Sequence, residues 1–147
     1  MKKLKKVTAA LAAATMVTSC AGVVTSADEV VNAVNVSYST VAETFTAADG
    51  TVVPAGATAV TLSIENNTGF SASDITLNAT ADLLGVDGIV AATNGSAYGD
   101  AIVSAAQNGS KVVVTSASLD NSKNDGTLVT LYTTSDAKVT VEDASFE

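Results

Sequence analysis

Apolar and polar residues alternate one by one along several segments of this chain. The alternation occupies residues 34–38, 60–65, 75–83 and 138–142. In a β-strand, successive side chains point to opposite faces, so such a pattern is typical of a strand with one buried face and one solvated face. Turn sequences rich in Asn, Asp and Gly separate these segments. The pattern predicts an all-β fold, a sandwich or a barrel, in a single domain.

Other segments extend this prediction. Residues 111–119 and 127–133 begin as nearly continuous apolar runs, which favour more central strands, whereas 100–106 is a weaker strand candidate because its alanines also allow a helix. The Asn-Gly pair at 108–109, between two apolar segments, predicts a β-hairpin. One short helical turn is expected within 81–92, where two glycines limit its length.

The first residues have the layout of a secretory signal peptide. Four lysines precede a short apolar run and a region of small residues, which predicts a cleaved leader over residues 1–27 and a mature domain over 28–147. A second reading stays open, because "VTSC" resembles a bacterial lipobox, in which Cys20 would become the lipidated first residue. Either reading predicts a bacterial protein that is secreted or held at the cell surface.

Removal of the leader makes the chain strongly acidic. From Asp28 onward, three lysines stand against fifteen acidic residues, which leaves a formal net charge of −12. Such a surface repels phosphate backbones and anionic lipids, so we expect no nucleic-acid partner, and membrane contact only through a lipid on Cys20.

The chain carries little that could perform catalysis. It has no His and a single Cys, so an ordinary nucleophile–base pair and a zinc site are not expected, and we expect no enzyme activity.

The chain has no Trp, which disfavours a stacking face for sugars. "DNSKNDG" at 120–126 could be an acidic calcium loop, but a solvated turn is the better interpretation. What is left is recognition of a protein by a polar sheet face.

Three stretches resemble the cohesin modules of bacterial cellulosome scaffolds. "VVPAGATAVTLSIENNTGF" is similar to the cohesin opening, "DITLNATADLL" to a later strand and turn, and "KVVVTSASLDNSKNDGTLVTLYT" to the late hairpin. "VTVEDASFE" resembles the final strand. Together these stretches span roughly residues 34–147.

The resemblance implies a flattened β-sandwich of about nine strands with jelly-roll topology. It implies binding of dockerins, the calcium-loaded modules of polysaccharide-degrading enzymes, with the calcium in the dockerin and no cofactor or metal site in this chain. The implied binding face includes Asp74, Thr76 and Asn78, and Gln107 stands where some cohesins carry a Tyr used in binding. Two alternatives stay open: a carbohydrate-binding module that takes polysaccharide, and a structural or adhesive surface lipoprotein.

Overall fold

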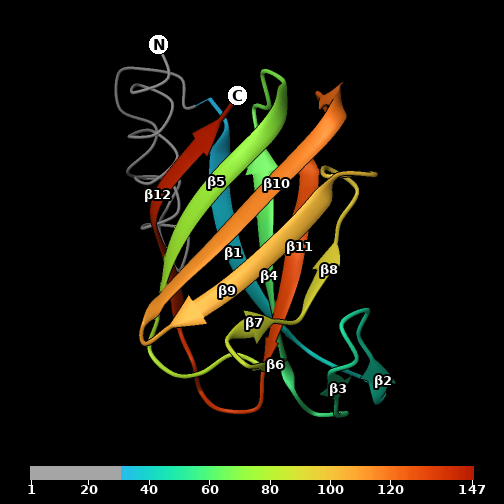
Figure 1. Cartoon of the computed structure of the whole chain (residues 1–147), viewed down its shortest axis with the longest axis vertical. Coiled ribbons are helices and arrows are strands. Elements are labelled where there is room, and N and C mark those ends of the chain that lie inside the picture. Colours follow the sequence, from blue (N-terminus) through green and yellow to red (C-terminus); the bar gives the residue numbers. More distant parts are fainter. Residues whose placement is uncertain (1–30) are drawn as a thin grey trace.

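The computed structural model describes residues 31–147, which form two packed antiparallel β-sheets and a small two-stranded ribbon (Figure 1). One sheet has four strands in the order β1 (Ala33–Thr40), β4 (Thr58–Glu65), β11 (Gly126–Thr133) and β8 (Ala92–Asn94). The other has six, in the order β12 (Val139–Phe146), β5 (Phe70–Ala79), β10 (Lys111–Ser122), β9 (Ile102–Asn108), β7 (Ile89–Val90) and β6 (Gly85–Val86). The ribbon pairs β2 (Phe45–Thr46) with β3 (Val52–Val53).

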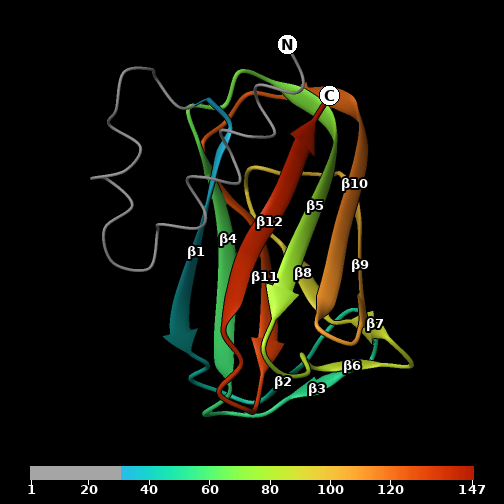
Figure 2. The same cartoon turned by 90° about the vertical axis from the view of Figure 1, so that its left-hand side faces the viewer.

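The all-β prediction is confirmed, and the two sheets face one another as in a sandwich (Figure 2). Twelve strands are present in residues 31–147, five of them only two or three residues long. The two apolar runs form inner strands, because β10 lies between β5 and β9 and β11 lies between β4 and β8. The segment 100–106, for which the sequence allows both a strand and a helix, lies largely within strand β9, which runs from Ile102 to Asn108.

The alternating segments build the core between the sheets. Alternate residues are buried along most of β4 and β5, in the first halves of β1 and β10, and on both sides of the irregularity in β12. Most of the fully buried side chains are Val, Leu or Ile. Phe70 adds an aromatic group at one end, where its ring meets Tyr98 at 5.9 Å and Phe146 at 5.1 Å between centroids. Burial of these apolar side chains is the main force that joins the two sheets.

The expected helical turn in 81–92 is wrong, because this segment forms the hairpin of β6 and β7. Val86 pairs with Ile89 across a two-residue loop in which Asp87 (φ 52°) and Gly88 (φ 83°) both have positive φ. Two consecutive positive φ values are the mark of a type I′ hairpin turn, which Asp-Gly favours. At Gly85 a Cβ atom would lie 2.0 Å from the Ile89 carbonyl oxygen, so the close pairing of these strands requires glycine there.

The other hairpin prediction is confirmed. Asn108 pairs with Lys111, and Gly109 and Ser110 form the two-residue loop between β9 and β10. Gly109 has φ 63°, a conformation that its lack of a side chain permits.

The β2–β3 ribbon is joined to the body of the sandwich by a second, smaller apolar cluster. Val53, Ala57 and Tyr132 belong to this cluster, together with three further alanines. The turn of the ribbon is held by Asp49, whose carboxylate accepts hydrogen bonds from the Thr51 amide (3.0 Å) and hydroxyl (2.9 Å). The ribbon is therefore a fixed part of the fold.

Two predictions fall outside the described residues. The signal peptide of residues 1–27 and the lipidation of Cys20 both concern the segment before residue 31. Within residues 31–147 no helix has the length and hydropathy needed to span a membrane.

Candidate protein-binding face

The candidate site is the outer face of the six-stranded sheet, which is turned toward the viewer in Figure 1. On β5 the side chains of Ile75 and Leu77 are fully buried, so the residues between them must point outward. Asp74 is exposed, and Thr76 and Asn78 are half-buried, as expected for the outer row of a strand flanked on both sides. The structure thus brings these three predicted residues together in one row.

The neighbouring strands surround this row with small polar side chains. On β10, Thr115 lies opposite Asp74 and Lys111 lies opposite Asn78. On β12, Ser145 lies opposite Asp74 and Asp143 lies opposite Thr76. Directly opposed residues on one face are close enough for their side chains to interact, so Asp74 stands among hydroxyl groups.

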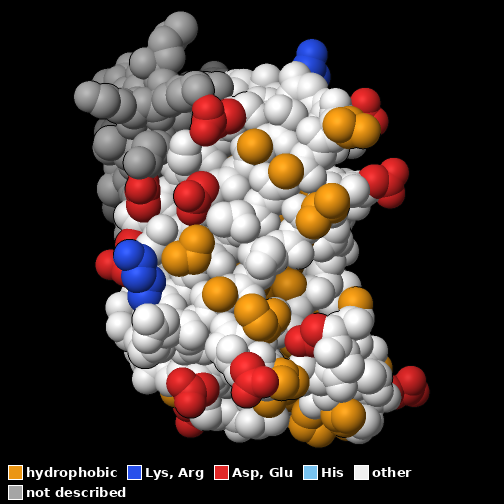
Figure 3. Space-filling model, in the orientation of Figure 1, with side chains coloured by type: hydrophobic (Ala, Val, Ile, Leu, Met, Phe, Trp, Pro, Cys, Tyr) orange, Lys and Arg blue, Asp and Glu red, His pale blue; other side chains and the backbone are white. Residues whose placement is uncertain are grey.

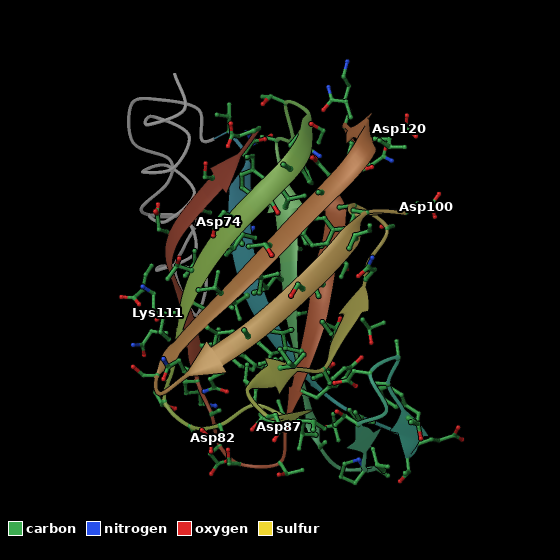
Figure 4. All side chains as sticks on the ribbon, in the orientation of Figure 1. Asp74, Asp82, Asp87, Asp100, Lys111 and Asp120 are labelled. Atoms are coloured by element: carbon green, nitrogen blue, oxygen red, sulfur yellow. The ribbon has the colours of Figure 1, made fainter. Side chains whose placement is uncertain are left out.

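The outer row of β5 carries one charge, the exposed carboxylate of Asp74. Asp74 is labelled in Figure 4, and within residues 31–147 its carboxylate makes no hydrogen bond or ion pair. Acidic side chains are spread across this side of the molecule in the space-filling view (Figure 3), and Lys111 is the only basic residue in the six strands of the sheet. The face therefore favours a partner with positive charge.

Large apolar side chains are also exposed on this sheet, which the sequence analysis did not identify. Ile102 on β9 is 80% exposed, and Leu119 on β10 is fully exposed. Ile102 lies opposite Ala117, which in turn lies opposite Ala72 on β5. The signal was present in the alternation of 111–119, whose odd-numbered residues face outward, but the run of three valines at its start obscured it.

Gln107 is placed apart from the other three predicted residues. It follows the buried Ala105 by two positions on β9, so its side chain leaves the strand on the inner side. There its amide nitrogen donates to the carbonyls of Gly109 (3.0 Å) and Ala81 (3.2 Å), and its amide oxygen accepts from the Leu83 amide (2.8 Å). These contacts hold the connection between β5 and β6, and a role of Gln107 in partner binding stays a prediction.

A buried chain of hydroxyl groups lies beneath the face. The Ser73 hydroxyl is 2.8 Å from that of Tyr98 and 2.7 Å from that of Ser116. Burial raises the pKa of the Tyr98 phenol above its ordinary value, and the hydrogen bonds to Ser73 and Ser116 act in the opposite direction. The three hydroxyls satisfy one another, which removes the cost of burying them.

The face offers hydrogen-bonding and apolar groups. In the part of the chain that the structure describes, no three His, Cys, Asp or Glu side chains are grouped so as to hold a metal ion. What this arrangement can do chemically is to form a polar interface with an apolar margin. No protein-family model matches the chain, and no curated protein matches its sequence.

Proposed function

We propose that residues 28–147 form a secreted, non-catalytic, cohesin-like module that binds dockerin-bearing polysaccharide-degrading enzymes. The observation that carries the proposal is the outer row of β5. Asp74, Thr76 and Asn78 occupy this row, and they are the residues for which the resemblance to cohesins implies binding. We also propose that the strands are connected in the jelly-roll topology that the resemblance implies.

The surroundings of this row support a protein partner. The face combines charge from Asp74, hydrogen-bonding groups from the hydroxyls of Thr115 and Ser145, and apolar area from the exposed Ile102 and Leu119. Protein–protein interfaces combine the same elements, with a few anchor side chains inside a polar rim. Calcium in this partnership is bound by the dockerin, and this chain contributes no cofactor.

The test is direct binding to purified dockerins from the same bacterium. We expect at least one calcium-loaded dockerin to bind the mature protein in isothermal titration calorimetry, and the same dockerin to lose binding after calcium is removed by a chelator. If no dockerin binds, and calcium makes no difference, the proposal is wrong.

The mode of attachment is part of this proposal. A docking module assists polysaccharide breakdown when it is retained at the cell surface, and a lipid on Cys20 would retain it there. Intact mass spectrometry of the membrane and culture fractions distinguishes a diacylglyceryl adduct on a chain that starts at Cys20 from a free chain that starts near Asp28.

A further inference from the structure

A concave cleft lies between the β2–β3 ribbon and strand β8, away from the outer row of β5. Its volume is about 520 Å³, which falls within the size range of pockets that bind small ligands. The lining residues are Phe45, Thr46, Ala47, Ala48, Ala92, Thr93, Asn94 and Val103. In Figure 1 the ribbon stands at the lower right, below β8.

An aromatic ring forms one side of this cleft. The chain has three phenylalanines, and Phe45 is one of them. Its side chain is large and apolar, yet the residue is 37% exposed. Its ring packs edge-on against Tyr132, with 5.3 Å between centroids and an angle of 73° between the planes. Tyr132 is itself buried, so it fixes Phe45 in place while leaving part of the ring open to the cleft.

The same Tyr132 also organises the polar side. Its hydroxyl donates a hydrogen bond to the Thr93 hydroxyl oxygen (2.8 Å), which leaves the Thr93 hydrogen able to serve as a donor. The side-chain amide nitrogen of the neighbouring Asn94 donates a hydrogen bond to the Ala101 carbonyl oxygen (2.9 Å). Within residues 31–147, the Asn94 amide oxygen accepts no hydrogen bond, so it can serve as an acceptor for a ligand.

The character of the lining limits the ligand. None of the eight lining residues is ionisable, and the chain as a whole is acidic, so an anionic ligand would find no opposite charge. A purely apolar ligand would cover Thr93 and Asn94 without satisfying their hydrogen-bonding groups, which is costly. The cleft therefore suits a neutral ligand with one apolar surface and a hydrogen-bonding edge.

We propose that this cleft binds a neutral pyranose unit of a glycan. A pyranose ring has a face of C–H groups that can stack on Phe45, and a rim of hydroxyls that can pair with Thr93 and Asn94. The small side chains of Ala47, Ala48 and Ala92 leave room for it. The site is independent of dockerin binding, because it uses β2, β8 and the inner side of β9 rather than the outer row of β5.

The experiment is an NMR titration of the ¹⁵N-labelled mature protein with neutral tetrasaccharides of glucose, xylose and mannose. Each is added to about 10 mM, because a site with one stacking ring gives weak binding. We expect at least one of them to shift the amide signals of Thr46, Thr93 and Asn94 in a saturable manner. A proline-rich peptide is titrated in parallel. If no tetrasaccharide shifts these signals, or if only the peptide shifts them, the proposal is overturned.

Variants of the ring extend the test. Phe45→Ala should weaken the binding of the active tetrasaccharide about tenfold, because the stacking surface is lost. Phe45→Trp retains a flat ring and should bind at least as tightly as the native protein. The matched control is Val52→Ala, since Val52 is exposed on the same ribbon, opposite Thr46, and does not line the cleft. Equal binding by Phe45→Ala and the native protein would overturn the proposal.

Discussion

The hydroxyl of Tyr38 binds both backbone groups of Val139. It accepts a hydrogen bond from the Val139 amide (2.9 Å) and donates one to the Val139 carbonyl (3.2 Å). Tyr38 belongs to β1 in one sheet, and Val139 begins β12 at the edge of the other. One side chain therefore occupies the position that a neighbouring strand would take, and it protects part of an edge that could otherwise pair with another chain.

Replacement of Tyr38 by Phe should lower the free energy of unfolding by about 1–2 kcal/mol, because two partly buried backbone groups lose their partner. The ring is retained, so its contact with Lys138, whose Nζ lies 5.1 Å from the ring centroid, should persist. Guanidinium denaturation measures the difference. The control is Ser37→Ala, an exposed neighbour on β1 that should change stability by less than about 0.5 kcal/mol. A Phe variant as stable as the native protein would show that water replaces the hydroxyl without cost.

Replacement of Gln107 by Leu should release the connection between β5 and β6. The variant loses three hydrogen bonds, so we expect a loss of about 1–3 kcal/mol in stability. Hydrogen exchange at the Leu83 amide should become faster, because this amide donates to Gln107 in the native protein. Ser104→Ala, an exposed position on the same strand, is the control. Unchanged protection of the Leu83 amide would contradict the interpretation of Gln107 as a structural clamp.

Much of the fold could be predicted because alternation and turn chemistry are local signals. The alternation predicts the burial of Ile75 and Leu77 from their positions alone. The Asn-Gly pair at 108–109 predicts the hairpin from its residue types. The error at 81–92 has a local cause too. Asp87–Gly88 between Val86 and Ile89 is a hairpin signal, but the alanines and leucines around it also favour a short helix.

The site was predictable only within one strand. The outward row of β5 follows from period two, whereas Thr115 and Ser145 join Asp74 through strand pairing, which a single sequence does not reveal. The same holds for Phe45 and Tyr132, which lie 87 positions apart in the numbering and meet only because the ribbon folds onto β11. The resemblance groups Gln107 with the outer row, although its position two residues after the buried Ala105 places it on the inner side.

Reversal of the charge at Asp74 should weaken dockerin binding by tenfold or more, on the order of 1.4 kcal/mol, because a positive charge would replace the carboxylate of the outer row of β5. Asp74→Lys should leave stability within about 0.5 kcal/mol, since the side chain is exposed. Calorimetry with the calcium-loaded dockerin measures the affinity, and denaturation measures the stability.

The matched control for Asp74→Lys is Asp136→Lys. Asp136 is exposed in the connection between β11 and β12, so the variant has the same net charge but an unaltered outer face. We expect it to bind as the native protein does. Equal affinities for the two variants would place the interface elsewhere on the molecule.

Alkaline pH should destabilise the protein through Tyr98. Burial raises the pKa of this phenol in the folded state, so the folded protein holds the proton more tightly than the unfolded chain. Its contribution to stability is complete below the unfolded pKa of about 10 and is lost as the pH rises through the folded pKa. Other tyrosines and the lysines titrate in the same range, so the informative quantity is the difference between the native protein and Tyr98→Phe.

Tyr98→Phe should be less stable than the native protein at neutral pH by about 1 kcal/mol, because Ser73 loses one of its two hydroxyl partners. Above about pH 10 the native protein should lose stability faster than the variant, which has no phenol at this position to ionise, and the two curves should converge. Urea denaturation at a series of pH values from neutral to alkaline measures both curves. Parallel curves would mean that Tyr98 ionises as readily in the folded protein as in the unfolded chain, and would contradict its burial beneath the outer face.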